Sequence, residues 1–410
     1  MKKILLFTSH DLNARDYGCV LRIRNIARIL SRHGEVRVVL GSRFGEVLQI
    51  AKPSQAGFEL AGKIQFYRDW YSFPGRIRAA LKSDYLDIEN YQASTSDRER
   101  LQAFMAEQDL VWVHGLETAN AFGFWRWPTS VVDVDDIPSS VYALRLSQPN
   151  SFLQKCKDWT QMILWRRNEK YLRRRFDAIC VCSERDREKV GHESVFVLPN
   201  GIETPQGIPP RHPVAPPQIG FVGTFVYWAN CDAVEWFIRK VWPRILERLP
   251  NARLRLAGER GEGMFRGPNV ESLGWVRNME DEMANWSLAI VPVLVGGGTR
   301  IKILEAFSRK CPVVSTTLGC YGHDVQNGHD ILIADKPDDF AASCLRILED
   351  PAEGERLADN AWAKFSKNST WDSHAGRIAK VVAKVWGTRV PPIKTDTLSS
   401  WKLVPKAIST

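Results

Sequence analysis

Three glycines followed by a threonine form a segment whose residue types suit anion binding. Gly296, Gly297, Gly298 and Thr299 follow one another directly. Glycines let the backbone turn tightly and approach a ligand closely, and Thr299 is suited to cap a helix that begins after it. A glycine loop that leads into a helix N-terminus offers unpaired N–H groups to an anion. The segment therefore predicts a phosphate site.

Two cations and a carboxylate continue this segment. Arg300, Ile301 and Lys302 occupy the first turn of the expected helix, where cations are unfavourable unless an anion is bound. Glu305 lies six residues beyond Thr299, roughly 9 Å along a helix axis, where a carboxylate can accept hydrogen bonds from a ribose. The pattern predicts a nucleoside diphosphate site, in which Arg300 and Lys302 stabilise the diphosphate electrostatically. The alternative is a surface Lys302–Glu305 pair, which leaves the glycines and Arg300 unexplained.

Composition bounds the class of protein. At 410 residues the chain is long enough for two domains, and 44% hydrophobic with 25% charged residues is typical of a globular protein. The eight cysteines contain no CxxC pair, which favours a reduced, cytoplasmic location. The apolar run at the N-terminus is too short for a signal peptide, and none reaches the ~18–20 residues of a membrane span. We expect neither a metal nor another cofactor.

Much of the net charge of +9 lies in residues 145–177, which hold nine Lys or Arg against three Asp or Glu. Tryptophans and other apolar residues are interleaved with these charges. The pattern suits peripheral contact with an anionic membrane. A nucleic acid partner is not expected, because no zinc-finger, RNP or helix-turn-helix signature is present. The alternative is an amphipathic helix that turns Phe152, Cys156, Trp159 and Ile163 toward a core.

Short apolar runs alternate with helical periodicity along the whole chain, which predicts an α/β protein with parallel sheets covered by helices on both faces. Residues 43–107 are the least readable, and Trp70, Tyr71, Phe73 and Pro74 suggest a loop or lid. The predicted strands are 4–8, 36–40, 110–114, 131–134, 178–182, 195–198, 219–222, 252–257, 288–292, 312–315 and 331–334, and the predicted helices are 18–31, 119–124, 231–249, 299–309, 338–348, 352–365 and 371–386.

Six prolines between residues 205 and 217 divide the chain. Such a run forms neither a helix nor a central strand, and predicts a semi-rigid linker. The predicted organisation is therefore a Rossmann-like doubly wound domain at 1–203, the linker at 204–217, a second Rossmann-like domain at 218–370, a C-terminal helix at 371–387 that crosses back toward the first domain, and a tail at 388–410.

The order and spacing of these segments resemble family 4 of the retaining, nucleotide-sugar-dependent glycosyltransferases, most closely the bacterial branch that builds surface polysaccharides. The resemblance implies the GT-B architecture, in which two Rossmann-like domains face a central cleft. It also implies a nucleotide-sugar donor held by the second domain and a glycan or lipid-linked acceptor held by the first. The matching segments are 18–30, 132–136, 176–184, 197–202, 221–232, 296–312 and 328–334.

On the donor side, the resemblance makes Glu305 the glutamate that grips the ribose. The first glutamate of the family's motif would stand eight residues earlier, where this chain has Gly297. Contacts to the donor sugar are therefore expected from backbone N–H groups around the glycines.

The family also commonly places an Arg and a Lys after the strand that leads to Gly223. Here Thr224 and about Asn230 stand at those positions. Arg300 and Lys302 are expected to supply the missing charge, and Gly223 and Thr224 to contact the donor. Retention through attack on the face of the departing phosphate would need no enzymic nucleophile.

On the acceptor side, Asp135 and Asp136 stand where the family often has a cleft-lining His or Asp. Either is predicted to orient the donor sugar or accept a proton, or one of them caps the next helix. Gly18 stands where the family's first loop approaches both substrates. Arg22 is predicted to meet an anionic acceptor or to be a solvated surface residue, and His114 to face the cleft or be structural.

Two other functions fit the same architecture. A nucleotide-sugar 2-epimerase would release free nucleotide and an altered sugar without an acceptor. A non-catalytic donor-binding subunit of a glycan assembly complex is suggested by Gly297. An NAD-dependent enzyme fits least, because no Gly-x-Gly-x-x-Gly follows the first strand.

Overall fold

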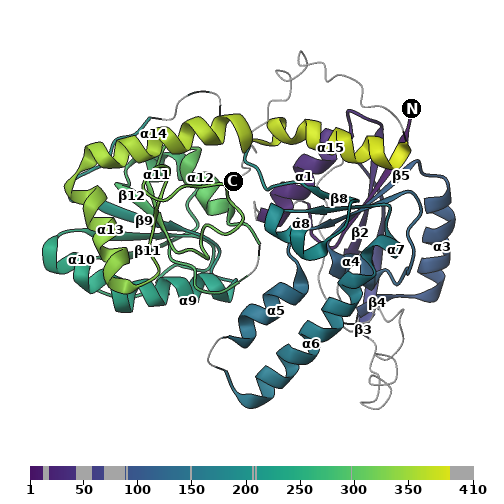
Figure 1. The fold of residues 1–410 in the computed structure, drawn as a ribbon, viewed down its shortest axis with the longest axis horizontal. Helices are drawn as coiled ribbons and strands as arrows, with labels where there is room; N and C mark the ends of the chain where they lie inside the picture. The colour runs from purple at the N-terminus through teal and green to yellow at the C-terminus, as the bar shows by residue number, and fades with distance from the viewer. Residues whose placement is uncertain are drawn as a thin grey trace, which may run out of the picture.

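Two parallel sheets, each covered by helices, form two α/β domains that lie side by side (Figure 1). The computed structural model describes residues 1–12, 18–42, 58–68, 88, 91–147, 150–205, 207, 210–296 and 298–387. Gly297, the expected loop at Trp70–Pro74 and the tail at 388–410 lie outside these residues.

The first sheet has the strand order β4-β3-β2-β1-β5-β6-β7-β8, and only β3 and β4 pair in antiparallel fashion. Helices cover both faces, so the central strands are continuous apolar runs rather than alternating ones. Every residue of β1 after the first is buried. The strands are β1 (Lys3–Thr8), β2 (Glu35–Ser42), β3 (Glu59–Arg68), β4 (Tyr91–Ala93), β5 (Leu110–His114), β6 (Ser130–Val134), β7 (Ala178–Val181) and β8 (Val195–Val197).

Helices α1 and α15 supply the core on one face of this sheet, and α3, α4, α6 and α7 supply it on the other. The C-terminal helix α15 packs against α1 with Trp371 and Ile378 buried among residues of β1 and β5. The helices are α1 (Gly18–Leu30), α3 (Thr95–Ala106), α4 (Leu116–Ala121), α5 (Pro138–Leu146), α6 (Phe152–Lys170), α7 (Leu172–Arg175), α8 (Glu184–Val190) and α15 (Trp371–Trp386).

The second sheet is entirely parallel and has the order β11-β10-β9-β12-β13-β14. Two buried clusters fill its faces. Its strands are β9 (Gln218–Val222), β10 (Arg253–Ala257), β11 (Val270–Gly274), β12 (Leu288–Val291), β13 (Val313–Ser315) and β14 (Leu332–Ile333), and its helices are α9 (Trp228–Trp236), α10 (Trp242–Arg248), α11 (Met279–Ala284), α12 (Ile301–Phe307), α13 (Pro337–Glu349) and α14 (Pro351–Asn368).

The structure adds strands β3, β4 and β11 to those predicted. Each lies at or next to a sheet edge, where side chains are half-exposed and no apolar run marks the strand. The predicted helix 231–249 begins earlier, at Trp228, and a π-helical turn at Phe237–Val241 separates α9 from α10. Pro243 follows this turn and cannot donate an N–H, which disfavours a regular α-helical ladder there.

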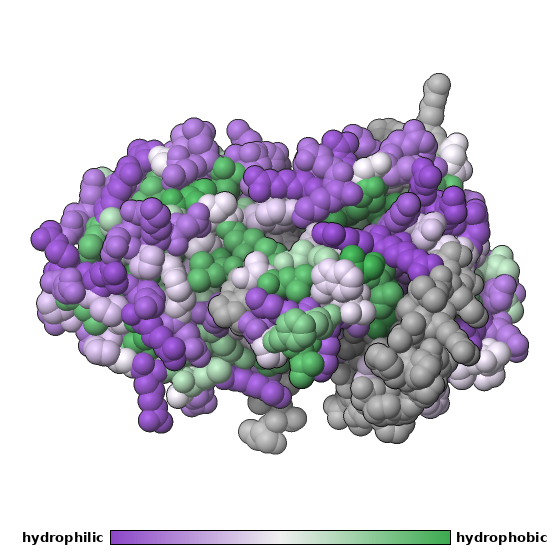
Figure 2. Space-filling model, turned by 60° about the horizontal axis from the view of Figure 1, so that its bottom comes forward, coloured by the Kyte–Doolittle hydropathy of each residue, from purple (hydrophilic) through white to green (hydrophobic). Residues whose placement is uncertain are grey.

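Helices α5 and α6 form a hairpin that projects away from the first sheet (Figure 1). The prediction that Phe152, Cys156, Trp159 and Ile163 face a core is wrong, because all four side chains are exposed. A second stripe of the same helix, which includes Trp165, is buried instead. On the face shown in Figure 2, hydrophobic side chains gather where the hairpin comes forward. No helix among the described residues is long and apolar enough to cross a membrane.

Candidate functional site

The site lies where the strand order of each sheet reverses, between β1 and β5 in the first and between β9 and β12 in the second. Ligands of parallel sheets bind at such positions, beyond the carboxyl ends of the strands. The two ends meet in this protein. Asn200 Nδ2 donates to Thr299 Oγ1 at 2.9 Å across the domains. A Cβ added to Gly18 would lie 2.6 Å from Ile301 Cδ1.

Gly298 shows how closely the domains approach. Its φ of +69° favours glycine, and a Cβ built there would lie 1.7 Å from Asp136 Oδ1. The glycine loop after β12 and the carboxylate after β6 therefore form opposite walls of one narrow site.

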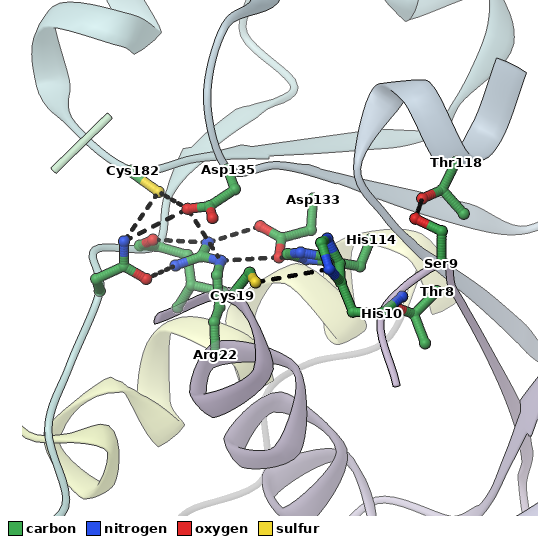
Figure 3. Close-up of polar contacts among 12 residues, drawn as sticks. Thr8, Ser9, His10, Cys19, Arg22, His114, Thr118, Asp133, Asp135 and Cys182 are labelled. Atoms are coloured by element: carbon green, nitrogen blue, oxygen red, sulfur yellow. Dashed lines mark hydrogen bonds and ion pairs between the residues drawn. The ribbon is translucent and has the colours of Figure 1, made fainter. Parts of the chain in front are cut away.

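A buried polar cluster lies in the first domain, near Asp135 (Figure 3). Arg22 is fully buried, and its Nε and Nη2 donate to the two Asp133 oxygens at 2.8 and 2.6 Å. Its other donors reach Asn200 Oδ1 and the Leu198 carbonyl, both at 3.0 Å. Burial opposes both charges, but Arg22 and His114 together hold the Asp133 pKa well below its usual range. Both predictions for Arg22 are therefore wrong. The side chain is not exposed to solvent, and its guanidinium is enclosed by protein, so an anionic acceptor substrate cannot reach it.

His114 belongs to the same cluster. It is buried, and its Nδ1 lies 2.9 Å from Asp133 Oδ2. Its ring meets that of His10 edge to face at 5.7 Å, and His10 Nδ1 lies 3.6 Å from Cys19 Sγ. The structural interpretation of His114 fits this burial. His10 was not singled out from the sequence, because nothing near it in the chain marks a partner.

Asp135 and Asp136 differ in environment. Asp135 Oδ1 lies 3.0 Å from Cys182 Sγ and 3.4 Å from Asn200 Nδ2. The Asp136 carboxyl opens to solvent in the cleft but is crowded by protein, and this crowding and the Asp135 charge raise its pKa to about 7. Neither caps the next helix, because α5 has Ile137 at its N-cap and no side-chain cap bond. The capping alternative is wrong.

Arg300 braces the glycine loop. Its guanidinium donates to the carbonyls of Gly298 at 2.7 Å and Gly296 at 2.8 Å. Arg300 also occupies the N-cap position of α12, without a side-chain cap bond. The prediction that Thr299 caps this helix is wrong, because the Thr299 hydroxyl accepts from Asn200 instead. Arg300 thus fixes the loop that would present its N–H groups to a ligand.

Lys302, on α12 after the glycine loop, is half-buried. Its Nζ donates to Asn230 Oδ1 at 2.6 Å and lies 4.2 Å from the centre of the Phe221 ring. Burial and the nearby Arg300 charge lower its pKa to about 7. A Cβ on Gly223 would lie 3.1 Å from this amine, so the glycine leaves room beside it.

Thr224 and Asn230 occupy the positions where charged residues were expected by resemblance. Asn230 Nδ2 donates to the Thr224 carbonyl at 2.7 Å, while its Oδ1 holds Lys302. One amide therefore links the loop after β9 to the amine from α12.

Glu305 and His323 complete the surroundings. The Glu305 carboxylate lies 3.6 Å from the Arg309 guanidinium, and its charge also acts on the Lys302 amine. His323 Nε2 donates to the Arg300 carbonyl at 3.0 Å, and burial lowers its pKa to about 4. Within the described part of the chain, no group of three or more His, Cys, Asp or Glu is arranged to hold a metal ion.

Asn200 was missed at the sequence level, although it joins Arg22, Asp135 and Thr299. The local signals were its Pro-Asn-Gly context and its place in the matching segment 197–202. Its partners are far along the chain, so their meeting depends on the fold.

Residues 216–350 match the model of the glycosyl transferases group 1 family. A curated relative, an uncharacterized 44.6 kDa protein in the cps region of Klebsiella pneumoniae, is 24% identical over 246 residues. That match covers 55% of this chain and 61% of the relative, which is less than two thirds of its length.

Solved structures share the fold over nearly the whole chain. Sucrose-phosphate synthase from Thermosynechococcus elongatus is 15% identical and has a TM-score of 0.68, with 94% of this chain and 100% of that chain covered. HepE of Anabaena, in complex with UDP and glucose, is 15% identical at a TM-score of 0.64, with 93% and 100% covered. WaaG, a glycosyltransferase involved in lipopolysaccharide biosynthesis, is 15% identical at 0.57, with 92% and 99% covered. The fold is that of GT-B glycosyltransferases.

Proposed function

We propose that this glycosyltransferase moves a sugar, with retention of configuration, from a nucleotide sugar to a glycan or lipid-linked acceptor in surface polysaccharide synthesis. Support comes from the group 1 family match and from the relative in a cps region. The similar structures include one with bound UDP and glucose and one involved in lipopolysaccharide biosynthesis. A cytoplasmic location at the inner membrane face is part of this proposal.

The observation that carries the proposal is the enclosed amine of the half-buried Lys302. Among the described residues, no carboxylate lies within ion-pair distance of it; Glu305 favours its charge from further away, but the nearer influence of Arg300 opposes it. Enclosing a cation with so little opposite charge is costly, and an anion placed between Gly223 and the glycine loop would reduce that cost. A diphosphate fits this requirement, and Glu305 lies one turn further along the same helix to meet the ribose.

The proposed reaction breaks the bond between the anomeric carbon and the diphosphate oxygen. The acceptor oxygen bonds to that carbon on the same face, and its proton passes to the departing phosphate, so a nucleoside diphosphate is released. Lys302 and the loop braced by Arg300 stabilise the extra negative charge. Asp136, opposite Gly298, orients the donor sugar. Asp135 remains the alternative for that role or for accepting a proton.

The decisive assay combines a panel of nucleotide sugars with and without lipid-linked acceptors. A transferase consumes donor fastest with an acceptor and forms a new glycoside, whose anomeric configuration NMR reads directly. Release of nucleotide and an altered sugar without acceptor would show the 2-epimerase. Tight nucleotide binding without turnover of any donor would show a non-catalytic donor-binding subunit.

Membrane contact is proposed for the free end of the α5–α6 hairpin. Phe152, Leu153 and Trp159 are 80%, 73% and 57% exposed, and Lys155 and Lys157 stand beside them. Apolar residues next to basic ones are typical of helices that lie on anionic bilayers.

Co-sedimentation with phosphatidylglycerol vesicles tests this contact. The wild type should bind and be released as salt rises, because surface attraction is screened beyond about 10 Å at 0.1 M salt. Replacing Phe152, Leu153 and Trp159 by Ser should abolish binding. The matched control replaces Val226, Met264 and Trp275, which are also exposed but lie in the other domain. Equal binding by both variants would contradict the contact.

A further inference from the structure

A cavity of about 920 Å³ lies between the hairpin and helices α7 and α8. Gly296, Gly298 and Tyr321 of the second domain line part of it. Those two glycines belong to the loop that faces Asp136, so the cavity is continuous with the wall of the proposed donor site. The cavity is large enough for a sugar and a charged group beside it.

The lining of this cavity is rich in cations. Five basic side chains line it, against two carboxylates. They come from the end of α6, from α7 and from α8, three elements that the chain brings together around one space. The five are Arg166, Lys170, Arg173, Arg174 and Lys189.

The two carboxylates already have partners. Glu169 accepts from the Ser139 N–H at 2.8 Å and from its hydroxyl at 2.6 Å. Asp186 accepts from the hydroxyls of Ser183 at 2.6 Å and Tyr321 at 3.1 Å. Both acids are also influenced by cavity cations: the Arg166 and Lys189 charges act on Glu169, and Lys189 lies 3.7 Å from Asp186. Two carboxylates therefore face five cations, and the lining keeps a net positive charge.

Within the described residues, Lys189 is the one of these five cations that has an ion pair. Lys189 lies 3.7 Å from Asp186 and donates to Tyr321, so its charge is partly used. Within the described residues, no carboxylate lies within ion-pair distance of Arg166, Lys170 or Arg173. An excess of cations over carboxylates around one cavity favours an anionic ligand, and Arg is suited to bind phosphate through its forked donors.

Apolar side chains form the rest of the wall, including Ile137, Leu144 and Leu172. A ligand with both a charged group and an apolar part would therefore use the whole cavity. Ser139 and Ser140 also line the cavity, and the Ser140 hydroxyl accepts from Lys189 Nζ at 3.2 Å.

We propose that this cavity binds the acceptor through a phosphate or diphosphate group, held by Arg166, Lys170 and Arg173. The acceptor hydroxyl then faces Gly296 and Gly298, beside the donor. This inference rests on the proposed transferase function and specifies its acceptor. It also replaces the anionic contact expected at Arg22, which is sealed in the core. The phosphate belongs either to a lipid diphosphate or to a soluble sugar phosphate.

The test is calorimetric titration of inorganic pyrophosphate into the full chain saturated with UDP, which keeps the donor site filled. The variant Arg166→Gln, Lys170→Gln, Arg173→Gln should weaken pyrophosphate binding at least tenfold. The matched control Lys240→Gln, Arg266→Gln, Lys367→Gln removes the same charge from exposed residues outside the cavity lining and should bind as the wild type does. Equal affinities in the two variants, or no binding by the wild type, would overturn the proposal.

Two further ligands distinguish the sources of phosphate. Farnesyl diphosphate should bind at least tenfold more tightly than pyrophosphate if the acceptor is lipid-linked, because the apolar wall adds contact. Glucose 1-phosphate should match pyrophosphate, with no gain from farnesyl, if the acceptor is soluble. Failure of UDP to bind would contradict the donor assignment alone. The two variants could still be compared with pyrophosphate in that case, because neither of them changes a residue of the proposed donor site.

Discussion

Arg22 is a fully buried cation and Lys302 a half-buried one, each on a helix that borders the site, and their surroundings differ. Arg22 has a carboxylate in bidentate contact, and each of its donor groups has a protein acceptor. Lys302 has one amide oxygen and the face of an aromatic ring. The first arrangement is complete without a ligand. The second becomes complete when an anion arrives, so burial of a charge indicates a binding site only when its countercharge is missing.

The largest expected effect follows from breaking the complete cluster. Arg22→Gln leaves Asp133 buried without its main partner, which should reduce the free energy of unfolding by about 3–5 kcal/mol. Urea unfolding followed by tryptophan fluorescence measures this loss. The double change Arg22→Met with Asp133→Leu should recover most of it, because no charge then remains unpaired. UDP affinity of the folded protein should not change. A loss below 1 kcal/mol would mean that the cluster is not structural.

The next effect concerns the incomplete site. Lys302→Met should weaken UDP binding by about 30- to 150-fold, since a hydrogen bond to a charged group contributes roughly 2–3 kcal/mol. Uridine binding should change little, because the amine would meet only phosphate. Stability should stay the same or rise, because a buried amine is removed. The control Lys336→Met removes an exposed lysine of the same domain. Unchanged UDP affinity, measured by calorimetry, would remove Lys302 from the donor site.

Protonation sharpens the same comparison. With a pKa of about 7, the Lys302 amine is mostly neutral at pH 8 in the free protein. A bound diphosphate favours the charged form, so UDP binding at pH 8 should take up close to one proton and weaken as pH rises above 7. Calorimetry in buffers of different ionisation enthalpy measures the uptake. The Asp136→Asn variant should show the same proton uptake as the wild type, and the Lys302→Met variant should show none. Equal uptake in all three proteins would assign the proton elsewhere.

Folding stability should change with pH in the opposite direction to UDP affinity. The Lys302 pKa is lower in the folded protein than in the unfolded chain, where it is near 10.5. The unfolded state therefore binds more protons between pH 7 and about 10, and this residue makes the free energy of unfolding rise with pH in that window.

The sequence identifies the central strands but not the edge strands or the packed face of α6. The apolar runs of β1, β5 and β9 identify central strands because both of their faces are buried. The edge strand β11, with the sequence Val-Glu-Ser-Leu-Gly, carries no such run. The α6 helix has two apolar stripes, and the sequence does not say which one packs, because that depends on α5 and α7.

Site residues also divide into those whose signal lies nearby in the sequence and those whose partners are distant in the chain. Gly298 and Lys302 were predicted because their signal is local: glycines, cations and a glutamate lie within ten residues. The role of Arg22 was not predictable, because its partner Asp133 lies 111 residues away. Asn230 became informative only when its amide was found between Lys302 and Thr224.

The smallest expected effect concerns Glu305, the residue that should read the ribose. Glu305→Gln keeps one acceptor oxygen and removes the charge, so UDP affinity should fall by about 5- to 10-fold, or roughly 1 kcal/mol. The loss should be smaller for 2′-deoxy-UDP, which lacks one of the hydroxyls that the carboxylate would bind. Arg309→Gln is the matched control, because it removes the protein partner of Glu305 but not the ribose contact. Equal losses for UDP and the deoxy analogue, with an unchanged melting temperature, would return Glu305 to a surface ion pair with Arg309.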